Sequence, residues 1–475
     1  MTRSLAALAG LALSTSLLGA PLAGTASAEP LAVAAPELSI HFEKYQLPNG
    51  LTVVLSVDRT VPVVAVNTMV RVGSRHETRG RTGFAHLFEH LMFMGTERVP
   101  SGAFDAWMEA EGAWNNAWTS NDRTDYFDVG PRHTLPLLLW LEADRFSSLA
   151  TSMTAEKLEA QRKVVRNERR QTSENQPYGK ARLRLPELLY PAGHPYHHPV
   201  IGSHEDLEAA TVEDVKGFFQ EWYVPSNCSL VVAGDIDLEA TKRLVEQTLG
   251  QLPLAKSPTS APKPGFPRLP GVVRETMHDD VELAKLSFAW HSPAHFAPGD
   301  AELDVLASVL DQGKSSRLYK ALVYDEQLAQ SVRASQVSQE LSSYFLIEVV
   351  ARKGVSLDRI ERVVFDGLAA LRREGPKPAE LERAKVDFEA SFVRRLESVQ
   401  DRASLLNTYE TALGDPGYLE RDLARYRRVD ALAVRRAAEA VFDPEAVVIM
   451  RVLPKPKSEP DAAKAPSGAK LEVAR

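Results

Sequence analysis

A segment dense in proline, serine and glycine interrupts the chain near its middle and limits how the chain can fold. It covers residues 252–272 and includes LPLAKSPTSAPKPGFPRLPG, which has neither helical nor strand periodicity. It divides a chain of 475 residues, more than one hydrophobic core normally holds. We therefore expect two domains, at 29–251 and 273–453. The C-terminal residues, 454–475, are also rich in proline, serine and glycine and are predicted to be a disordered tail.

The two halves end in similar patterns, which predicts a duplicated α+β unit. Residues 214–235 and 432–453 each have a helical pattern, an aromatic residue two positions before a proline, and an apolar strand. Tyr223-Val224-Pro225 in the first half matches Phe442-Asp443-Pro444 in the second. Two such matches at the ends of halves of similar size favour duplication over chance.

Periodicity predicts the elements of the first half. Strands are expected on both sides of Asp58-Arg59, a helix at 82–94, a helix running into a strand at 105–130, and long charged helices at roughly 133–175. In the second half, the segment that would correspond to 82–94 has the sequence AELDVLASVLDQG, which contains no histidine.

The N-terminal residues have the pattern of an export signal. Residues 1–28 contain Arg3, an apolar segment and the small-residue cleavage site Ala26-Ser27-Ala28. A membrane anchor is the alternative, but the apolar segment is short and contains Pro21. We expect a signal peptide at 1–28, cleavage near Ala28, and a periplasmic or secreted mature protein without stable membrane insertion.

Cysteine content and charge exclude several classes of protein. Cys228 is the only cysteine, so an exported chain cannot form an internal disulfide, and cysteine-dependent catalysis or zinc binding is disfavoured. The net charge is −7 and no long basic stripe is present, so nucleic acid is not expected as a partner.

The apolar stretch GFAHLFEHLMFMGT, residues 83–96, contains His86, Glu89 and His90. On a helix these positions share one face, where two imidazoles one turn apart suit a zinc ion and the carboxylate between them suits a general base. This is the H-x-x-E-H arrangement, the inverse of H-E-x-x-H. The alternative is a pair of helix-surface histidines, which the apolar flanks disfavour. Glu168 is the best candidate for a third ligand, although its charged helix alone would favour a solvated position.

These residues resemble a known family. GSRHETRGRTGFAHLFEHLMFMGT is similar to the zinc site of the pitrilysin/insulinase metallopeptidases, and the chain resembles their short two-domain bacterial members, which are related to mitochondrial processing peptidase. VVRNE, residues 164–168, matches the context of the family's third ligand, and NNAWTSNDRTDYF matches a strand that pairs with peptide substrates. The resemblance implies that Glu168 is a metal ligand and that Asn116 and Ala117 bind substrate.

The resemblance also implies a fold and a partner. The expected fold is α+β, with two homologous α/β-sandwich domains in a pitrilysin-like half-clamshell, each a mainly antiparallel sheet with helices packed on one side. Gln161 occupies a position where relatives often have an acid, and we assign no role to it. Val323 and Gln330 stand where relatives have a substrate-binding Arg and Tyr. A dimer is therefore expected, either with a related zinc-free chain that supplies this pair or with itself.

The sequence thus predicts a zinc-dependent endopeptidase that cuts peptides or unfolded segments in an enclosed chamber. His86, His90 and Glu168 would bind one Zn²⁺ per chain, and Glu89 would activate zinc-bound water. The alternative is a non-catalytic peptide-holding subunit of a heteromeric chamber. Metal-dependent hydrolysis of a non-peptide ester is less favoured, because a strand such as that of Asn116 and Ala117 suits an extended peptide.

Overall fold

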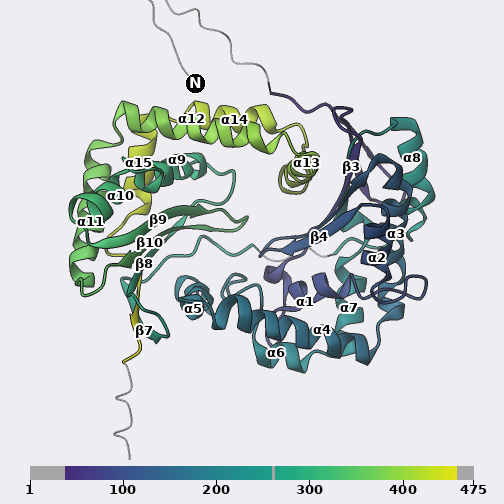
Figure 1. Cartoon of the computed structure of the whole chain (residues 1–475), viewed down its shortest axis with the longest axis horizontal. Helices are drawn as coiled ribbons and strands as arrows, with labels where there is room; N and C mark the ends of the chain where they lie inside the picture. The colour runs from purple at the N-terminus through teal and green to yellow at the C-terminus, as the bar shows by residue number, and fades with distance from the viewer. Residues whose placement is uncertain (1–37, 259–262, 457–475) are drawn as a thin grey trace, which may run out of the picture. The chain divides into compact units, whose positions relative to one another are not determined.

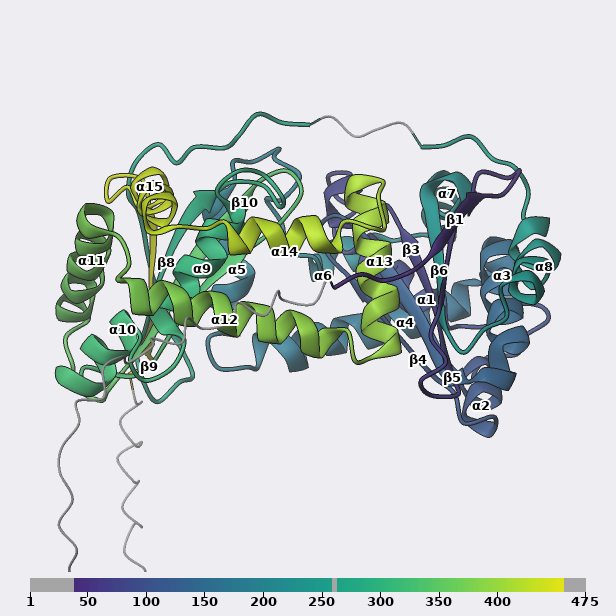
Figure 2. The same cartoon turned by 90° about the horizontal axis from the view of Figure 1, so that it is seen from above.

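The computed structural model describes residues 38–258 and 263–456 (Figures 1 and 2). The predicted signal peptide, part of the 252–272 segment and nearly all of the predicted tail lie outside these residues. Pro454, where the tail was expected to begin, is the last residue of a strand.

The first half forms a six-stranded sheet with the strand order β1-β2-β6-β3-β5-β4. Every neighbouring pair is antiparallel except β2 and β6, which are parallel. The strands are β1 Glu43–Gln46, β2 Thr52–Val57, β3 Val63–Val70, β4 Trp114–Thr119, β5 Thr124–Pro131 and β6 Cys228–Gly234.

The second half forms a five-stranded sheet with the order β7-β11-β8-β10-β9, in which only β7 and β11 are parallel. Its strands are β7 Val273–Asp279, β8 Lys285–Ser292, β9 Ala329–Val337, β10 Ser343–Ala351 and β11 Val448–Pro454. In both sheets the last strand of the half lies between two earlier strands and is parallel to the first of them. Strand β6 lies between β2 and β3, and β11 lies between β7 and β8. The predicted duplication is therefore present in the topology.

Helices fill the connections between the strands. The first half contains α1 Phe84–Leu91, α2 Ala103–Ala110, α3 Leu135–Ser152, α4 Ala155–Glu168, α5 Gly179–Leu189, α6 His204–Ala209, α7 Val212–Trp222 and α8 Leu238–Gln247. The second half contains α9 Asp300–Asp311, α10 Arg317–Tyr319, α11 Leu357–Glu374, α12 Pro378–Arg395, α13 Val399–Leu413, α14 Leu419–Arg427 and α15 Ala431–Val441. Single π-helical turns follow α4 at Arg169–Glu174 and α10 at Lys320–Asp325.

The predicted elements agree with these bounds except in one connection. The helix expected at 82–94 is α1, and the charged helices expected at 133–175 are α3, α4 and the π-helical turn. Between α2 and residue 131 the sequence analysis expected one strand, but the structure has two, β4 and β5, joined by a turn at residues 120–123. Turn-forming Ser120, Asn121 and Asp122 were the signal for this hairpin.

One face of each sheet carries its main core, as the expected fold requires. In the first half, buried apolar residues of α1, α3 and α7 pack against alternate residues of the strands, and in the second half α9, α11 and α15 do the same. The expected fold class, two α/β domains with mainly antiparallel sheets, is confirmed.

The second face of each sheet receives a helix from the other half. Val399, Ala403 and Leu406 of α13 pack against apolar side chains of the first sheet, and Ala181, Leu185 and Leu189 of α5 pack against the second sheet. Figure 2 shows α13 beside β3, and Figure 1 shows α5 beside β7 and β8. Asn407 adds polar contacts, because its Nδ2 donates to Asn67 Oδ1 at 2.6 Å and to the Asn67 carbonyl at 3.0 Å.

Candidate metal centre

Helix α1 owes its position to its apolar residues. Phe84, Leu87, Phe88 and Leu91 are buried in the core of the first sheet. Because these four positions lie on one face of the helix, the opposite face carries the three polar residues at positions 86, 89 and 90. The side chains of His86 and His90 are 12% and 24% exposed. The predicted grouping on one helix face is therefore present.

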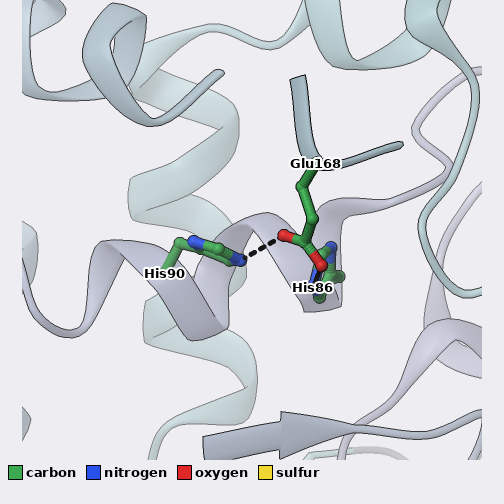
Figure 3. Close-up of side chains that lie close together, drawn as sticks. All are labelled: His86, His90 and Glu168. Carbon is green, nitrogen blue, oxygen red and sulfur yellow. Dashed lines mark ion pairs between the residues drawn. The ribbon is translucent and has the colours of Figure 1, made fainter. Parts of the chain in front are cut away.

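Helix α4 brings the third side chain to this face. It is capped by Thr154, whose side chain accepts a hydrogen bond from the Lys157 N–H, and it packs through Leu158 and Val165. Glu168 is its last residue, and its Oε2 lies 3.1 Å from His90 Nε2 while its Oε1 lies 3.6 Å from His86 Nε2. Figure 3 shows the carboxylate between the two imidazole rings.

These three residues fit a divalent metal ion. They offer two ring nitrogens and a carboxylate oxygen, all within 4.8 Å of one another. Burial, followed by the neighbouring His90, lowers the pKa of His86 to about 4, so this imidazole is neutral at pH 7. The hydrogen bond with His90 holds the pKa of Glu168 below its usual value, so this side chain is a carboxylate. Neutral imidazole and ionised carboxylate are the forms that bind zinc.

The orientation of His86 also suits a ligand. Its Nδ1 is buried without a hydrogen-bond partner among the described residues, whereas its Nε2 faces Glu168. Nε2 is therefore the nitrogen directed into the cluster, and the described part of the chain supplies no hydrogen-bond acceptor for the other nitrogen.

Glu89 lies beside this cluster and has a contact of its own. Its Oε2 accepts a hydrogen bond of 2.6 Å from Thr119 Oγ1, on the last residue of β4. The side chain is buried, and burial raises the pKa of the Glu89 carboxyl while the Thr119 hydrogen bond lowers it. Helix and strand thus together orient a carboxylate that is separate from the three ligand candidates. Thr119 belongs to the NNAWTSNDRTDYF segment, but nothing in that segment indicates this contact.

Asn116 and Ala117 lie on β4, which is the edge strand of the first sheet. The Ser120 N–H donates to the Arg123 carbonyl at the tip of the hairpin. From this residue pair onward, hydrogen-bonded and non-hydrogen-bonded residue pairs alternate along the two antiparallel strands. This alternation directs the backbone groups of Ala117 away from β5. The Ala117 N–H instead donates to Asn116 Oδ1 at 2.8 Å. Both residues are close in sequence to Thr119, so the predicted substrate strand and the Glu89 contact belong to one strand.

The second half has an equivalent helix that lacks the H-x-x-E-H residues. Helices α1 and α9 each follow a glycine with positive φ, Gly83 at +87° and Gly299 at +98°. Counting from these glycines, Glu302, Val305 and Leu306 stand where the first half has His86, Glu89 and His90. Val305 and Leu306 are buried in the core of the second half. The two halves thus share the scaffold, and the candidate metal ligands lie in the first.

Other residues named by the sequence analysis lie elsewhere. Val323 packs against the core of the second half, and Gln330 is exposed on β9. Gln161 is half-buried beside Met94. The proline-rich composition of HPYHHP, residues 194–199, favours surface histidines, but this interpretation is wrong for His194, which is buried and stacks on Tyr190 with ring centroids 4.6 Å apart. Proline-rich composition did not indicate that this loop packs against the second half.

A two-sheet α+β chain with an H-x-x-E-H helix and a downstream glutamate defines a class of zinc-peptidase-like proteins, and comparisons with known proteins give the family. The model described as Insulinase (Peptidase family M16) matches residues 52–193, and the model described as Peptidase M16 inactive domain matches residues 209–386. The chain is 31% identical over 370 residues to the zinc protease PqqE of Helicobacter pylori, which covers 77% of this chain and 83% of that protein. The chain therefore belongs to the insulinase family of peptidases.

Two other comparisons agree with this assignment, and a third shows the fold alone. A probable mitochondrial-processing peptidase subunit beta of Schizosaccharomyces pombe is 27% identical over 369 residues, which cover 75% of this chain and 79% of that protein. The crystal structure of a protease from Helicobacter pylori superposes with a TM-score of 0.82 at 28% identity, over 87% of this chain and all of that one. The periplasmic protease PqqL of Escherichia coli shares the fold, with a TM-score of 0.72 at 18% identity, but the match covers only 48% of that longer chain.

Proposed function

We propose that this chain is a zinc-dependent endopeptidase that hydrolyses peptides or unfolded segments. The observation that carries the proposal is the convergence of His86, His90 and Glu168, with ligand atoms within 4.8 Å of one another, beside the separate carboxylate of Glu89. The three residues would hold one zinc ion per chain, the ligand number of catalytic zinc sites. When bound, zinc supplies Lewis-acid chemistry, because it polarises a carbonyl and makes water more acidic.

Glu89 is the proposed general base. Its carboxylate would accept a proton from the attacking water and return it to the nitrogen of the leaving amine as the peptide bond breaks. The Thr119 hydroxyl occupies one lone pair of Oε2 and restricts the orientation of the carboxylate.

The open edge of β4 is the proposed substrate site. An extended peptide can add to an exposed sheet edge through backbone hydrogen bonds, which tolerate varied side chains. The Ala117 N–H would exchange its bond to Asn116 Oδ1 for a bond to a substrate carbonyl, and the Asn116 amide would then be free to contact the same peptide. The adjacent Thr119 contact places this edge beside Glu89.

We further propose that a second chain completes an enclosed chamber. Val323 and Gln330 do not supply the Arg and Tyr expected by family resemblance, so a related zinc-free chain that carries this pair is the preferred partner, with a homodimer as the alternative. The partner would be a chain of similar size that lacks H-x-x-E-H and is encoded by a neighbouring reading frame. Co-purification with it would distinguish the heterodimer from the homodimer.

A non-catalytic, peptide-holding role is the second candidate. It is favoured by the match of residues 209–386 to the model named as an inactive domain. That match begins after Glu168, whereas His86, Glu89, His90 and Glu168 all lie within the region matched by the insulinase model. Intact ligands and base favour catalysis.

Export is proposed from the sequence of residues 1–28. The periplasmic name of PqqL, which shares this fold, agrees with an exported location. Among residues 38–258 and 263–456, no helix is long and apolar enough to cross a membrane.

The test is cleavage of an unstructured peptide by the purified chain from Glu29 onward, alone and with the candidate partner. We expect cleavage that a chelator abolishes and added zinc restores. Cleavage that persists with the chelator would contradict metal dependence. Peptide binding without cleavage, in the presence of both zinc and the partner, would instead establish the holding role.

A further inference from the structure

Helix α1 begins without a cap from its own N-cap residue. Gly83 occupies that position in the left-handed conformation, with φ of +87°, and has no side chain to accept a hydrogen bond. The first N–H groups of a helix need acceptors, particularly in a buried setting. Here the acceptor comes from outside the helix: Glu77 Oε2 accepts from the Gly83 N–H at 2.9 Å, and Glu77 Oε1 accepts from the Ala85 N–H at 2.8 Å.

The side chain of Glu77 is fully buried, with 0% exposure. Burying a carboxylate is costly unless hydrogen bonds and positive charge compensate. The two backbone N–H groups and the positive end of the α1 dipole offset part of this cost, but burial outweighs them and raises the pKa of the Glu77 carboxyl to about 8. His198 Nδ1, 3.6 Å from Glu77 Oε2, is a further neighbour from the HPYHHP loop.

A separate set of contacts joins Thr82, which precedes Gly83, to residues 202–206. Asp206 accepts from the N–H and the hydroxyl of Thr82, at 3.0 and 2.5 Å, and the Ser203 N–H donates to the Thr82 hydroxyl at 3.0 Å. A Cβ on Gly202 would lie 2.4 Å from Gly83 Cα, so the two backbones touch. The Arg169 guanidinium, immediately after Glu168, donates to the Gly202 carbonyl.

We propose that Glu77 is a positioning residue for the metal centre. Its two oxygens fix the first turn of α1, and Ala85, which donates to Oε1, directly precedes His86. A tilt of this turn would carry His86 away from Glu168, whereas the loop at Gly202 keeps the end of α4 in place. The inference rests on the proposed metal site but not on catalysis. Glu77 lies outside the H-x-x-E-H motif, yet it sets the position of His86, the motif's first ligand.

Ordinary helix capping is the competing explanation, and it predicts lost stability alone. The test therefore compares Glu77→Gln with Asp206→Asn, a control in which a neighbouring carboxylate that binds Thr82 rather than α1 is made neutral. Glutamine retains one acceptor oxygen but turns an NH₂ group toward the other backbone N–H, so one of the two bonds is lost. Glu77→Asp keeps both oxygens on a shorter side chain and serves as the conservative variant.

The measurements are the dissociation constant of Zn²⁺, from competition between the apoprotein and a chromogenic chelator, and the urea midpoint of each apoprotein. We expect Glu77→Gln to weaken zinc binding about tenfold or more, as the loss of a residue that orients a ligand does at other metal sites. Asp206→Asn should bind zinc nearly as tightly as the parent does, even if its urea midpoint falls as far as that of Glu77→Gln. The zinc affinity of Glu77→Asp should lie between those of the parent and Glu77→Gln. If Glu77→Gln does not fold, weakened zinc binding by Glu77→Asp is the required result.

Two outcomes would overturn the proposal, and they differ. Equal zinc affinity in the parent and in a folded Glu77 variant, or equal loss in the Asp206 control, would reject positioning by Glu77 and leave the metal site intact. A parent protein that binds no zinc would reject the metal site itself, and with it this role.

Discussion

Replacing Glu89 with glutamine separates catalysis from metal binding and from folding. Glutamine has nearly the same shape, and its carbonyl oxygen can accept the Thr119 hydroxyl that now bonds Glu89 Oε2 at 2.6 Å. The side chain is buried and burial raises the pKa of the Glu89 carboxyl, so an uncharged replacement removes a desolvation cost. We therefore expect the Glu89→Gln protein to fold with undiminished stability.

The same substitution should remove most of the activity. Glutamine cannot accept the proton from water, and a positioned general base contributes about 10²–10⁴-fold to a rate. This factor corresponds to about 3–5.5 kcal/mol of activation free energy. The three candidate ligands are unchanged, so zinc should remain bound at the parent level.

The assay measures kcat on an unstructured peptide, zinc per chain by elemental analysis, and the urea midpoint. Thr119→Ser is the matched control, because it keeps the hydroxyl that orients the carboxylate and should stay near parent activity. A Glu89→Gln protein that cleaves within about threefold of the parent rate would refute the assignment of Glu89, since the loss would be far below that expected for a general base.

Three further outcomes are expected. His90→Ala should lose bound zinc, whereas His133→Ala, which alters an exposed histidine, should keep it; unchanged metal content in the first would reject the site. Thr119→Val should lower kcat about tenfold by removing a hydrogen bond to a carboxylate, worth about 1.5 kcal/mol, and an unaltered kcat would show that Glu89 needs no such support. Burial raises the pKa of Asp125 to about 7, so the folded state binds this proton more tightly than the unfolded state, whose pKa is near 3.8. The parent should therefore keep its full stability below about pH 4. Relative to Asp125→Asn, it should lose up to about 4 kcal/mol of unfolding free energy as pH rises through 7. If the unfolding free energies of the two proteins, measured with urea, change in parallel with pH, the buried proton is excluded.

The candidate site was predictable from sequence where one helix carries it. His86, Glu89 and His90 share a face because of helical spacing alone, and the apolar residues between them indicate which face is buried. Glu168 is 78 residues further along the chain, and its charged helix gives no signal of its own. Family resemblance, not periodicity, identified it as a ligand.

Residues that act through tertiary contacts were not predictable. Glu77 reaches the first turn of α1 across a loop, and neither its spacing from Gly83 nor its neighbours marks it as a cap. Thr119 contacts Glu89 only because β4 runs beside α1, and the sequence analysis had merged β4 and β5 into one strand. His194 is buried because its loop packs against the other half, a long-range contact that local composition does not record.

The reciprocal placement of α5 and α13 has a consequence for any attempt to divide this chain. Each helix is covalently part of one half yet packs on apolar strand residues of the other; Leu406 of α13, for example, shares a buried cluster with Val54 and Val231. A fragment ending near residue 258 would therefore expose the surface that α13 covers and present α5 without its partner sheet. Two fragments made by a cut in the 252–272 segment should instead remain associated, as complementary pieces of one folded unit whose assembly does not depend on the severed peptide bond.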